Sequence, residues 1–281
     1  LLFAQLGNSN RDMLKKAVLN ADDEASSYYA KRTSAQIVTY GIHNEADVRA
    51  THIQNMPEGS TFHVETPWGH GDFRLKVHGV HNVYNALAAM TTCLLEGIPL
   101  EEIRSSLQQF AGVHGRFQEI ETGRKFRVVV DYAHNPDGLK ATLQSAKEIT
   151  SGKMICVMGC RGERDRLKRP IMADIAASYS DYVLFTTDNP FSEDPEQIMA
   201  EMLGGLTSHE AGNWEVILNR KEAIQRAVEL AGDEDRIIIT GRGHETRYVA
   251  GSQIESFSDE DIVLRSLLDM EQGIQMMTPE L

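Results

Sequence analysis

Short apolar runs alternate with helix-patterned segments from residue 117 to residue 270, and this alternation constrains the fold more than any other feature. Strands are predicted at residues 117–121, 126–131, 153–158, 181–186, 214–218 and 236–240, and helices at residues 136–149, 168–179, 195–204, 220–231 and 259–270. Short loops between alternating elements are typical of a mostly parallel, doubly wound sheet with helices on both faces. Turn residues at 122–124 predict that the first two strands pair as a hairpin.

The first part of the chain has a mixed pattern. We expect a helix-like start over residues 1–6, a turn at 7–10, strands at 16–20 and 37–41, a helix at 24–31, a β-hairpin over 60–78 that turns at 67–72, and helices over 81–95 and 99–110. His81 or Asn82 is the expected N-cap region of the first long helix. Glycines 112 and 115 then punctuate a linker, so we place a domain boundary near residue 112, between residues 1–112 and 113–281.

Composition narrows the classes of function. The chain has 281 residues and a net charge of −13, which argues against nucleic-acid partners and anionic membrane surfaces. No apolar run approaches the roughly 18 residues of a membrane span, and no basic-then-apolar leader suggests secretion. Three cysteines without paired spacing fit a reducing compartment, so we expect a cytoplasmic protein. The same spacing argues against zinc binding, and we expect no metal site within this chain. Because the chain opens on Leu1-Leu2-Phe3 without methionine, we expect a fragment of a longer protein.

Polar clusters follow four of the predicted strands. Asp131-Tyr-Ala-His134 comes directly after the apolar run 128–130 and before Pro136, which suits the first turn of a helix. Carboxyl ends of parallel strands are where open α/β sheets bind ligands. An ordinary β–α loop with a polar cap is the alternative for this cluster alone.

The second cluster, residues 159–170, contains five basic residues in nine positions of an acidic chain. That excess indicates an anionic ligand such as a carboxylate or phosphate. The alternative, weighed about equally, is a helix start neutralised locally by Glu163 and Asp165.

The third and fourth clusters carry acceptors and close-approach glycines. Asp188 and Asn189 offer the acceptors and the donor that an amino acid's ammonium and carboxylate groups require, although an Asx turn before a proline is the simpler alternative. In Gly241-Arg-Gly-His-Glu245 the glycines let the backbone approach a ligand, and Glu245 can accept from an ammonium group. If the sheet is parallel, all four clusters share one edge.

These residues together resemble the Mur ligase family, the ATP-dependent, amide-bond-forming enzymes of peptidoglycan precursor synthesis, and within it the branch that adds the third residue of the stem peptide. The matching stretches run in order along nearly the whole chain: Asn20-Ala-Asp-Asp23, 81–89, Gly115-Arg116-Phe117, 131–138, 162–165, 168–170, Asp188-Asn-Pro190 and 241–245. The resemblance implies the later part of a central ATPase domain over residues 1–112, followed by a Rossmann-like amino-acid-binding domain over residues 113–281.

The resemblance also implies roles for single residues. Asn85, Arg116, Asp131 and His134 would bind ATP, at the adenine, the nucleotide and its phosphates. The incoming amino acid would be bound by Arg164, Asp188, Asn189, Pro190, Phe191, Gly241 and Glu245. ATP would phosphorylate the carboxylate of UDP-N-acetylmuramoyl-L-alanyl-D-glutamate, and the amine of a free amino acid would then attack the acyl phosphate. The protein would act as a monomer.

Two departures from the family pattern matter. The glycine-rich phosphate loop, the magnesium ligands, the modified lysine and the UDP-binding domain would all precede Leu1, so this chain alone is expected to hold no catalytic residue and to be inactive. Phe191 stands where users of meso-diaminopimelate usually have arginine, which makes L-lysine a serious option, unless Arg161 or Arg164 compensates. The alternatives are a non-catalytic amino-acid- or nucleotide-binding paralogue or truncation, and a folylpolyglutamate-type or cyanophycin-type ligase. The residues at 188–190 and 241–245 argue against the last two.

Overall fold

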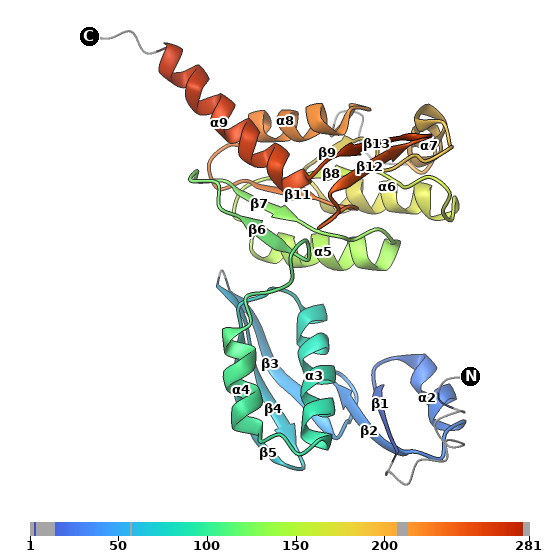
Figure 1. Cartoon of the computed structure of the whole chain (residues 1–281). Coiled ribbons are helices and arrows are strands. Elements are labelled where there is room, and N and C mark those ends of the chain that lie inside the picture. Colours follow the sequence, from blue (N-terminus) through green and yellow to red (C-terminus); the bar gives the residue numbers. More distant parts are fainter. Residues whose placement is uncertain (1–2, 4–14, 57, 207–212, 278–281) are drawn as a thin grey trace. The chain divides into compact units, whose positions relative to one another are not determined.

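The computed structural model describes residue Phe3 and residues 15–56, 58–206 and 213–277, with side chains up to residue 270. The expected turn at 7–10 and, apart from Phe3, the expected helix-like start lie outside these residues. The chain forms two compact units, Leu1–Ala111 and Gly112–Leu281. Figure 1 labels most of the elements of each unit.

The first unit is built on a five-stranded sheet in the order β1-β2-β3-β4-β5, parallel from β1 to β3 and antiparallel from β3 to β5. Its strands are β1 (Lys16–Asn20), β2 (Gln36–Gly41), β3 (Val48–Met56), β4 (Gly59–Thr66) and β5 (Gly69–Leu75), and its helices are α2 (Glu24–Ala30), α3 (Val80–Leu95) and α4 (Leu100–Gln109). Alternate residues of β4, such as Phe62 and Val64, face α3 and α4 and form the core with apolar residues of β3 and β5.

The expected β-hairpin of the first unit is confirmed as β4 and β5, but its turn is shorter than predicted. Residues 69–72 belong to β5, because Gly69 pairs with Thr66 and Asp72 with His63. Strand β3 was not predicted, since polar residues interrupt its second half and its register shifts between Thr51 and Gln54. The expected N-cap of α3 was also wrong: Gly79, with a φ of 93°, holds that position.

The second unit is a three-layer α/β fold. Its sheet has the order β10-β9-β8-β11-β7-β6, in which β6 is antiparallel to its neighbour and the other pairs are parallel. Its strands are β6 (Gln118–Ile120), β7 (Arg127–Val130), β8 (Met154–Met158), β9 (Tyr182–Phe185), β10 (Trp214–Val216) and β11 (Arg236–Ile239), and its helices are α5 (Pro136–Glu148), α6 (Lys168–Tyr179), α7 (Pro195–Leu203), α8 (Arg220–Leu230) and α9 (Asp259–Met277). The predicted doubly wound, mostly parallel sheet and the β6–β7 hairpin are both confirmed.

Two cores fill this unit, one on each face of the sheet. Val129 faces a core shared with α5, α6 and α7, whereas Val128 and Val130 face a second core shared with α8 and α9. Because side chains alternate along a strand, a continuous valine run supplies both faces. A two-stranded hairpin of β12 (Arg247–Ala250) and β13 (Gln253–Ser256) completes the unit. This hairpin was not predicted, because its strands are short and β13 is exposed throughout.

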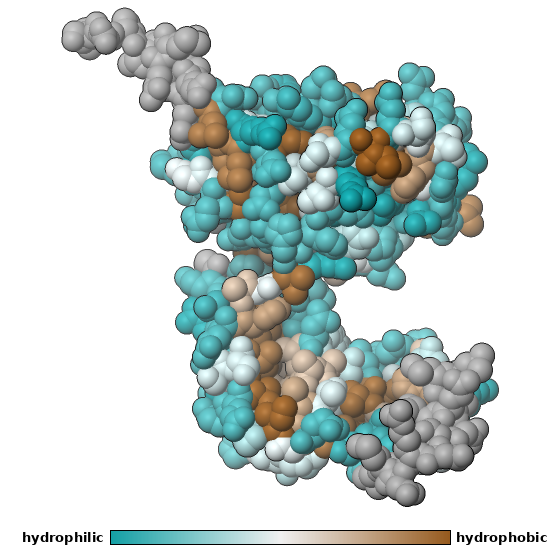
Figure 2. Space-filling view, viewed as in Figure 1, coloured by the Kyte–Doolittle hydropathy of each residue, from teal (hydrophilic) through white to brown (hydrophobic). Residues whose placement is uncertain are grey.

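On the side shown in Figure 2, the surface of the second unit is largely hydrophilic, with apolar residues along α9, where Leu264 and Leu268 are exposed, whereas apolar residues cover more of the first unit. None of the helices within the described ranges is both long enough and apolar enough to cross a bilayer.

Candidate functional site

The four polar loops of the second unit meet at one edge of its sheet. They follow β7, β8, β9 and β11, and the sheet order places these strands side by side as β9-β8-β11-β7. All four strands are parallel, so their carboxyl ends share that edge. The topology therefore joins residues that lie more than a hundred positions apart in the sequence.

Glu245 is the centre of the polar cluster at this edge. Its Oε1 accepts a hydrogen bond from Arg161 Nη1 at 2.7 Å, and its Oε2 accepts one from Asn189 Nδ2 at 3.1 Å. The Arg161 and Glu245 side chains are 20% and 18% exposed, so solvent reaches a largely buried ion pair. Burial alone would lower the pKa of Arg161, but Asp188 and Glu245 raise it, so this guanidinium stays charged.

Arg242 is fully buried and is bonded to the cluster through Asn189. Its Nη1 donates to Asn189 Oδ1 at 2.7 Å and lies 3.4 Å from Asp188 Oδ1. Its guanidinium lies near the rings of Tyr248 and Phe257, with the carbon 5.7 and 5.0 Å from their centres. Burial lowers the pKa of Arg242, and Arg220 lowers it further. The Asn189 amide is thus held by Arg242 on its oxygen and by Glu245 on its nitrogen.

Phe191 lies at the side of the cluster in a left-handed conformation, with a φ of 53°. Its N–H donates to the Val249 carbonyl at 3.2 Å, and its own carbonyl accepts from Gly251 at 2.6 Å. The Arg161 guanidinium carbon lies 5.3 Å from the centre of the Phe191 ring. This contact places a cation beside the residue that replaces the expected arginine.

Asp131 organises the loop after β7. Its carboxylate accepts from the Phe117 N–H at 2.7 Å, from the Ala133 N–H at 2.8 Å and from the Thr142 hydroxyl at 2.9 Å. These bonds fasten the segment around Arg116 to the end of β7. Asp131 is 7% exposed, and all three of these hydrogen bonds are internal to the second unit.

Aromatic contacts gather around Tyr132. The Arg116 guanidinium carbon lies 4.5 Å from the centre of its ring, and the rings of His134 and His244 lie 4.8 and 5.2 Å away. The His134 carbonyl accepts from Lys168 Nζ at 2.6 Å. The structure therefore groups Arg116, Asp131 and His134, three of the four residues predicted to bind ATP. The fourth, Asn85, is exposed on α3 of the first unit and donates to Asn82 at 3.2 Å.

Most of the basic residues in the loop after β8 have internal partners. Arg166 pairs with Glu201, Arg169 with Glu193 and Glu201, and Lys168 with a carbonyl. Arg164 is exposed, and its Nη1 donates to the neighbouring Glu163 carbonyl at 3.3 Å. Arg161 alone of these five joins the Glu245 cluster. The carboxylates that pair with Arg166 and Arg169 are Glu193 of the loop after β9 and Glu201 of α7, not the expected Glu163 and Asp165.

The remaining residues predicted to bind the amino acid also lie at this edge. Asp188, Asn189, Pro190 and Gly241 are buried, and a Cβ atom on Gly241 would lie 3.1 Å from the Asp188 carboxylate. Two members of the cluster were missed as site residues, Arg242 and, except as a substitute for Phe191, Arg161. A signal for Arg242 was present, because it lies between the two glycines of the loop after β11.

In the first unit, the motif Asn20-Ala-Asp22-Asp23 acts through hydrogen bonds. Burial disfavours the charged form of Asp22, but backbone N–H groups of Ile42, His43 and Asn44 and the Tyr84 hydroxyl hold its pKa well below the usual range. Asp22 thereby ties the end of β1 to the loop after β2 and to α3. Asp23 caps α2 through the Ala25 N–H.

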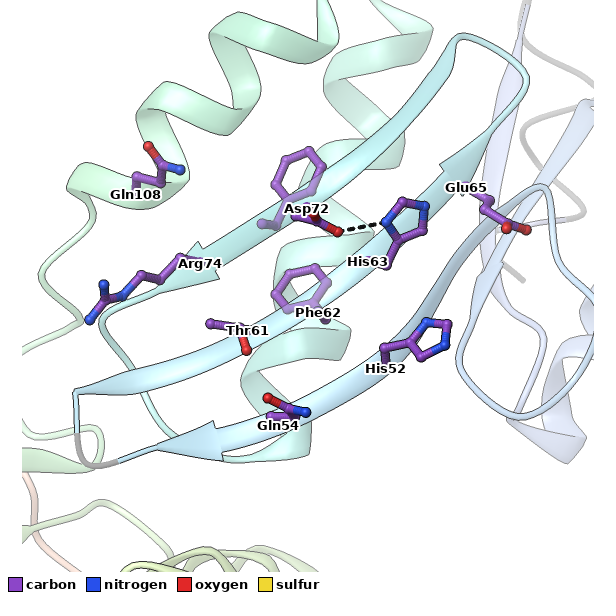
Figure 3. Close-up of a pocket in the computed structure, with 10 residues that line it drawn as sticks. His52, Gln54, Thr61, Phe62, His63, Glu65, Asp72, Arg74 and Gln108 are labelled. Atoms are coloured by element: carbon purple, nitrogen blue, oxygen red, sulfur yellow. Dashed lines mark hydrogen bonds and ion pairs between the residues drawn. The ribbon is translucent and has the colours of Figure 1, made fainter.

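A cavity of about 550 Å³ lies on the open face of the β3–β5 sheet (Figure 3). It is lined by His52, Gln54, Thr61, Phe62, His63, Glu65, Asp72, Phe73, Arg74 and Gln108. His63 Nδ1 lies 2.7 Å from Asp72 Oδ1, and this contact lowers the pKa of Asp72. None of the residues predicted from the sequence to bind ATP or an amino acid lines this cavity. Among the residues that the structure describes, no three His, Cys, Asp or Glu side chains could hold a metal ion together.

Comparison with known families identifies the class of protein. Residues 1–93 match the Mur ligase middle domain, and residues 115–243 match the Mur ligase, glutamate ligase domain. Together with a doubly wound sheet whose polar loops meet at one edge, these matches show that the chain belongs to the Mur ligase family.

Particular relatives narrow the comparison. The chain is 43% identical over 268 residues to UDP-N-acetylmuramoyl-L-alanyl-D-glutamate--2,6-diaminopimelate ligase of Bacillus cereus, covering 95% of the chain and 54% of that protein. It is 44% identical over 260 residues to the ligase of the same name in Listeria monocytogenes, covering 92% of the chain and 52% of that protein. The chain thus spans about half the length of these relatives.

Solved structures agree with this placement. A structure of UDP-N-acetylmuramoyl-L-alanyl-D-glutamate--2,6-diaminopimelate ligase superposes with a TM-score of 0.61 at 33% identity, covering 92% of the chain and 54% of that structure. UDP-N-acetylmuramoylalanyl-D-glutamyl-2,6-diaminopimelate--D-alanyl-D-alanyl ligase from Acinetobacter baumannii superposes with a TM-score of 0.65 at 22% identity, covering 93% of the chain and 52% of that structure, and it supports the fold alone.

Proposed function

We propose that the intact protein is an ATP-dependent ligase of peptidoglycan precursor synthesis. It joins a free amino acid to UDP-N-acetylmuramoyl-L-alanyl-D-glutamate through an acyl phosphate, whose phosphate group leaves when the amine attacks. The printed names of the relatives support this substrate pair. We also propose that it acts as a monomer in the cytoplasm. The chain spans about half the length of these relatives, and we propose that it is inactive alone.

The observation that carries the proposal is the Glu245 cluster in the second unit. An α-amino acid presents an ammonium and a carboxylate, and the cluster offers a carboxylate and a guanidinium within hydrogen-bond distance of each other. We propose that Glu245 receives the ammonium group, with Asn189 holding Glu245 in place and Asp188, Pro190, Phe191 and Gly241 shaping the site. Arg161 contacts a substrate carboxylate, and Arg164 remains one of the residues that the family resemblance predicts to bind the amino acid. Binding in this way positions the amine for attack.

We propose that Arg116, Asp131 and His134 of the second unit bind the nucleotide. Asn85 of the first unit remains a residue predicted to bind ATP. Asp131 contributes by fixing the segment that carries Arg116, because its hydrogen bonds are internal. Magnesium on the ATP phosphates would neutralise developing charge. The residues that the structure describes form no acidic or histidine cluster that fits such an ion.

Substituting Glu245 tests the proposal in the intact protein. We expect Glu245→Ala to raise the KM for the amino acid at least tenfold, since the ammonium group loses its acceptor and Arg161 loses its partner. The KM for ATP should stay within twofold. Glu229→Ala, which removes an exposed glutamate of α8, is the control. An unchanged KM for the amino acid would remove Glu245 from the site.

We propose meso-diaminopimelate as the amino acid, with L-lysine as the second candidate. The relatives' names favour the first. Phe191 has no charge for a distal carboxylate, but Arg161 lies against its ring, and its buried Nε has no hydrogen-bond partner among the described residues. L-Lysine lacks that carboxylate and needs no second cation.

The identity of residue 191 should control this preference. We expect Phe191→Arg to raise the ratio of kcat/KM for meso-diaminopimelate to that for L-lysine by about tenfold, because a bidentate arginine–carboxylate pair is added. Phe191→Leu, which adds no charge, should leave the ratio near its starting value. Selectivity that does not move in the arginine variant would contradict this account of the position.

A further inference from the structure

Arg169 is a fully buried cation next to the amino-acid site, near the start of α6. Its Nη1 donates to Glu193 Oε2 at 2.8 Å and to Glu201 Oε2 at 2.7 Å. Its Nη2 donates to Glu193 Oε1 at 2.9 Å and to the Arg161 carbonyl at 3.2 Å. One side chain therefore bonds the loop after β8, the loop after β9 and helix α7.

The two loops that Arg169 joins also touch each other directly. The Gly162 N–H donates to the Asn189 carbonyl at 2.9 Å, and a Cβ atom on Gly162 would lie 1.9 Å from the Pro190 carbonyl oxygen. Glu163 accepts from the Ser192 hydroxyl at 2.6 Å. We call this contact between residues 161–163 and 189–193 the seam. Arg161 and Asn189, which both hold Glu245, belong to it.

Charge explains why a guanidinium is needed at the seam. Hydrogen bonds from Arg169 lower the pKa of Glu193, and those from Arg166, Gln197 and Arg169 lower the pKa of Glu201 to about 2. Both carboxylates are therefore ionised at neutral pH. Without Arg169 the two partly buried carboxylates would lose their shared counter-charge, and the loops carrying Arg161 and Asn189 would lose their common anchor.

We infer that Arg169 is a positioning residue for the amino-acid site: it fixes Arg161 through its carbonyl and the 188–191 segment through Glu193. The kinetic part of this inference rests on the proposed function. Arg169 itself does not touch the substrate, since its side chain is fully buried and both of its Nη atoms are engaged by Glu193, Glu201 and the Arg161 carbonyl. A planar fork with several fixed donors suits this role, and lysine cannot reproduce it.

Arg166 provides a matched control. It shares Glu201 with Arg169, but its side chain is 59% exposed, whereas that of Arg169 is fully buried. Replacing either arginine by methionine removes one positive charge and one ion pair with the same carboxylate. Only Arg169→Met removes the bonds to Glu193 and to the Arg161 carbonyl.

Hydrogen–deuterium exchange on the full chain tests the structural part. We expect Arg169→Met to speed amide exchange at least tenfold in both loops, residues 159–165 and 187–193, while exchange in α8 stays unchanged. Arg166→Met should change neither loop by more than twofold. Arg169→Lys should fall between the wild type and Arg169→Met, and it carries the same test if the methionine variant does not fold.

Kinetics of the intact protein test the functional part. We expect Arg169→Met to raise the KM for the amino acid about tenfold, with kcat and the KM for ATP within twofold. Unchanged exchange in the two loops, or an equal effect of Arg166→Met, would overturn the inference. A uniform rise in exchange that includes α8 would also overturn it, because that result describes general destabilisation. If the intact wild type has no ligase activity but Arg169→Met still loosens both loops, the proposed function fails and the positioning role stands.

Discussion

At the residue scale, Gly115 shows how closely two segments of the second unit approach. Its φ is 71°, and a Cβ atom there would lie 2.1 Å from the His244 nitrogen and 2.5 Å from the Gly243 carbonyl carbon. Gly243 in turn lies against the Gly115 carbonyl. The segment before Arg116 therefore packs directly on the loop that carries Glu245, which only glycine allows.

Gly115→Ala should destabilise the second unit more than its backbone conformation alone requires. Gly123 also has a positive φ, of 65°, but a Cβ atom there would have no neighbour within 4 Å, so Gly123→Ala isolates the conformational cost of about 1–2 kcal/mol. We expect Gly115→Ala to cost roughly 1–3 kcal/mol more, from steric overlap. Urea unfolding of both variants measures the difference. Equal losses would show that the close approach relaxes without cost.

Sequence patterns located the four loops of the site but could not orient the side chains within them. Arg161 and Arg164 are both in the basic run, yet only Arg161 faces Glu245. Glu163 lies between them with a φ of 54°, and this left-handed residue turns the chain just before Arg164. Such a reversal depends on contacts with Ser192 and Glu193 from another loop, which a local pattern does not contain.

At the element scale, the strands of the second unit and its helices α5 to α8 were predictable to within a residue or two, because most of the strands are short apolar runs ending in turn residues. The end of α9 was not, since the predicted helix stops at residue 270 and α9 continues to Met277. Strand β3 and the β12–β13 hairpin were not predictable in the same way. Val48 and Ala50 are buried in β3, but the shift after Thr51 breaks the two-residue period. The β12–β13 hairpin is stabilised less by burial than by contacts of its backbone. Its strands pair with each other, and Ala250 pairs with Phe191.

Helices α8 and α9 are joined by a buried ion pair that should be costly to break. Arg220 donates from Nε and Nη2 to the two Asp259 oxygens, both at 2.8 Å, and from Nη2 to the Thr240 carbonyl at 2.8 Å. The two side chains are 1% and 0% exposed. Removing one partner leaves a buried charge without compensation.

Arg220→Met should therefore lower the free energy of unfolding by about 3–5 kcal/mol. Arg226, on the same helix, forms exposed pairs with Glu215 and Glu229, and Arg226→Met should cost at most about 1 kcal/mol. The double variant Arg220→Met/Asp259→Leu should be less damaged than the sum of its single changes. Urea denaturation of these variants, with Asp259→Leu alone among them, gives the coupling, and additive losses would argue against a direct pair.

At the scale of the whole molecule, each unit has its own hydrophobic core. The first is built around β3–β5, α3 and α4, and the second has the two cores on either side of its sheet. Within the described part of the chain, no residue of one unit belongs to a core of the other. The fold class was predictable because the apolar residues that form each core recur at strand or helix spacing within their own unit.

Residues 112–281 should consequently fold without the first unit. Expressed alone, this segment is expected to give a single cooperative urea transition by circular dichroism, with the midpoint seen for the same unit in the full chain. A variant with Val129→Asp, which places a charge in one of the two cores, is the control for an unfolded baseline. A broad, non-cooperative loss of signal from the isolated segment would contradict the independence of its cores.

Strand β11 lies in the middle of the sheet between β8 and β7, although it is the last of the six to be reached along the chain. During synthesis on the ribosome, β7 and β8 emerge before β11, the strand that pairs with both of them. At roughly 5–20 residues per second, the delay from β8 is several seconds. During that time both strands present apolar edges to other nascent chains. We therefore expect early termination before residue 236 to yield aggregation-prone products, and chaperones that shield such edges to matter most in this interval.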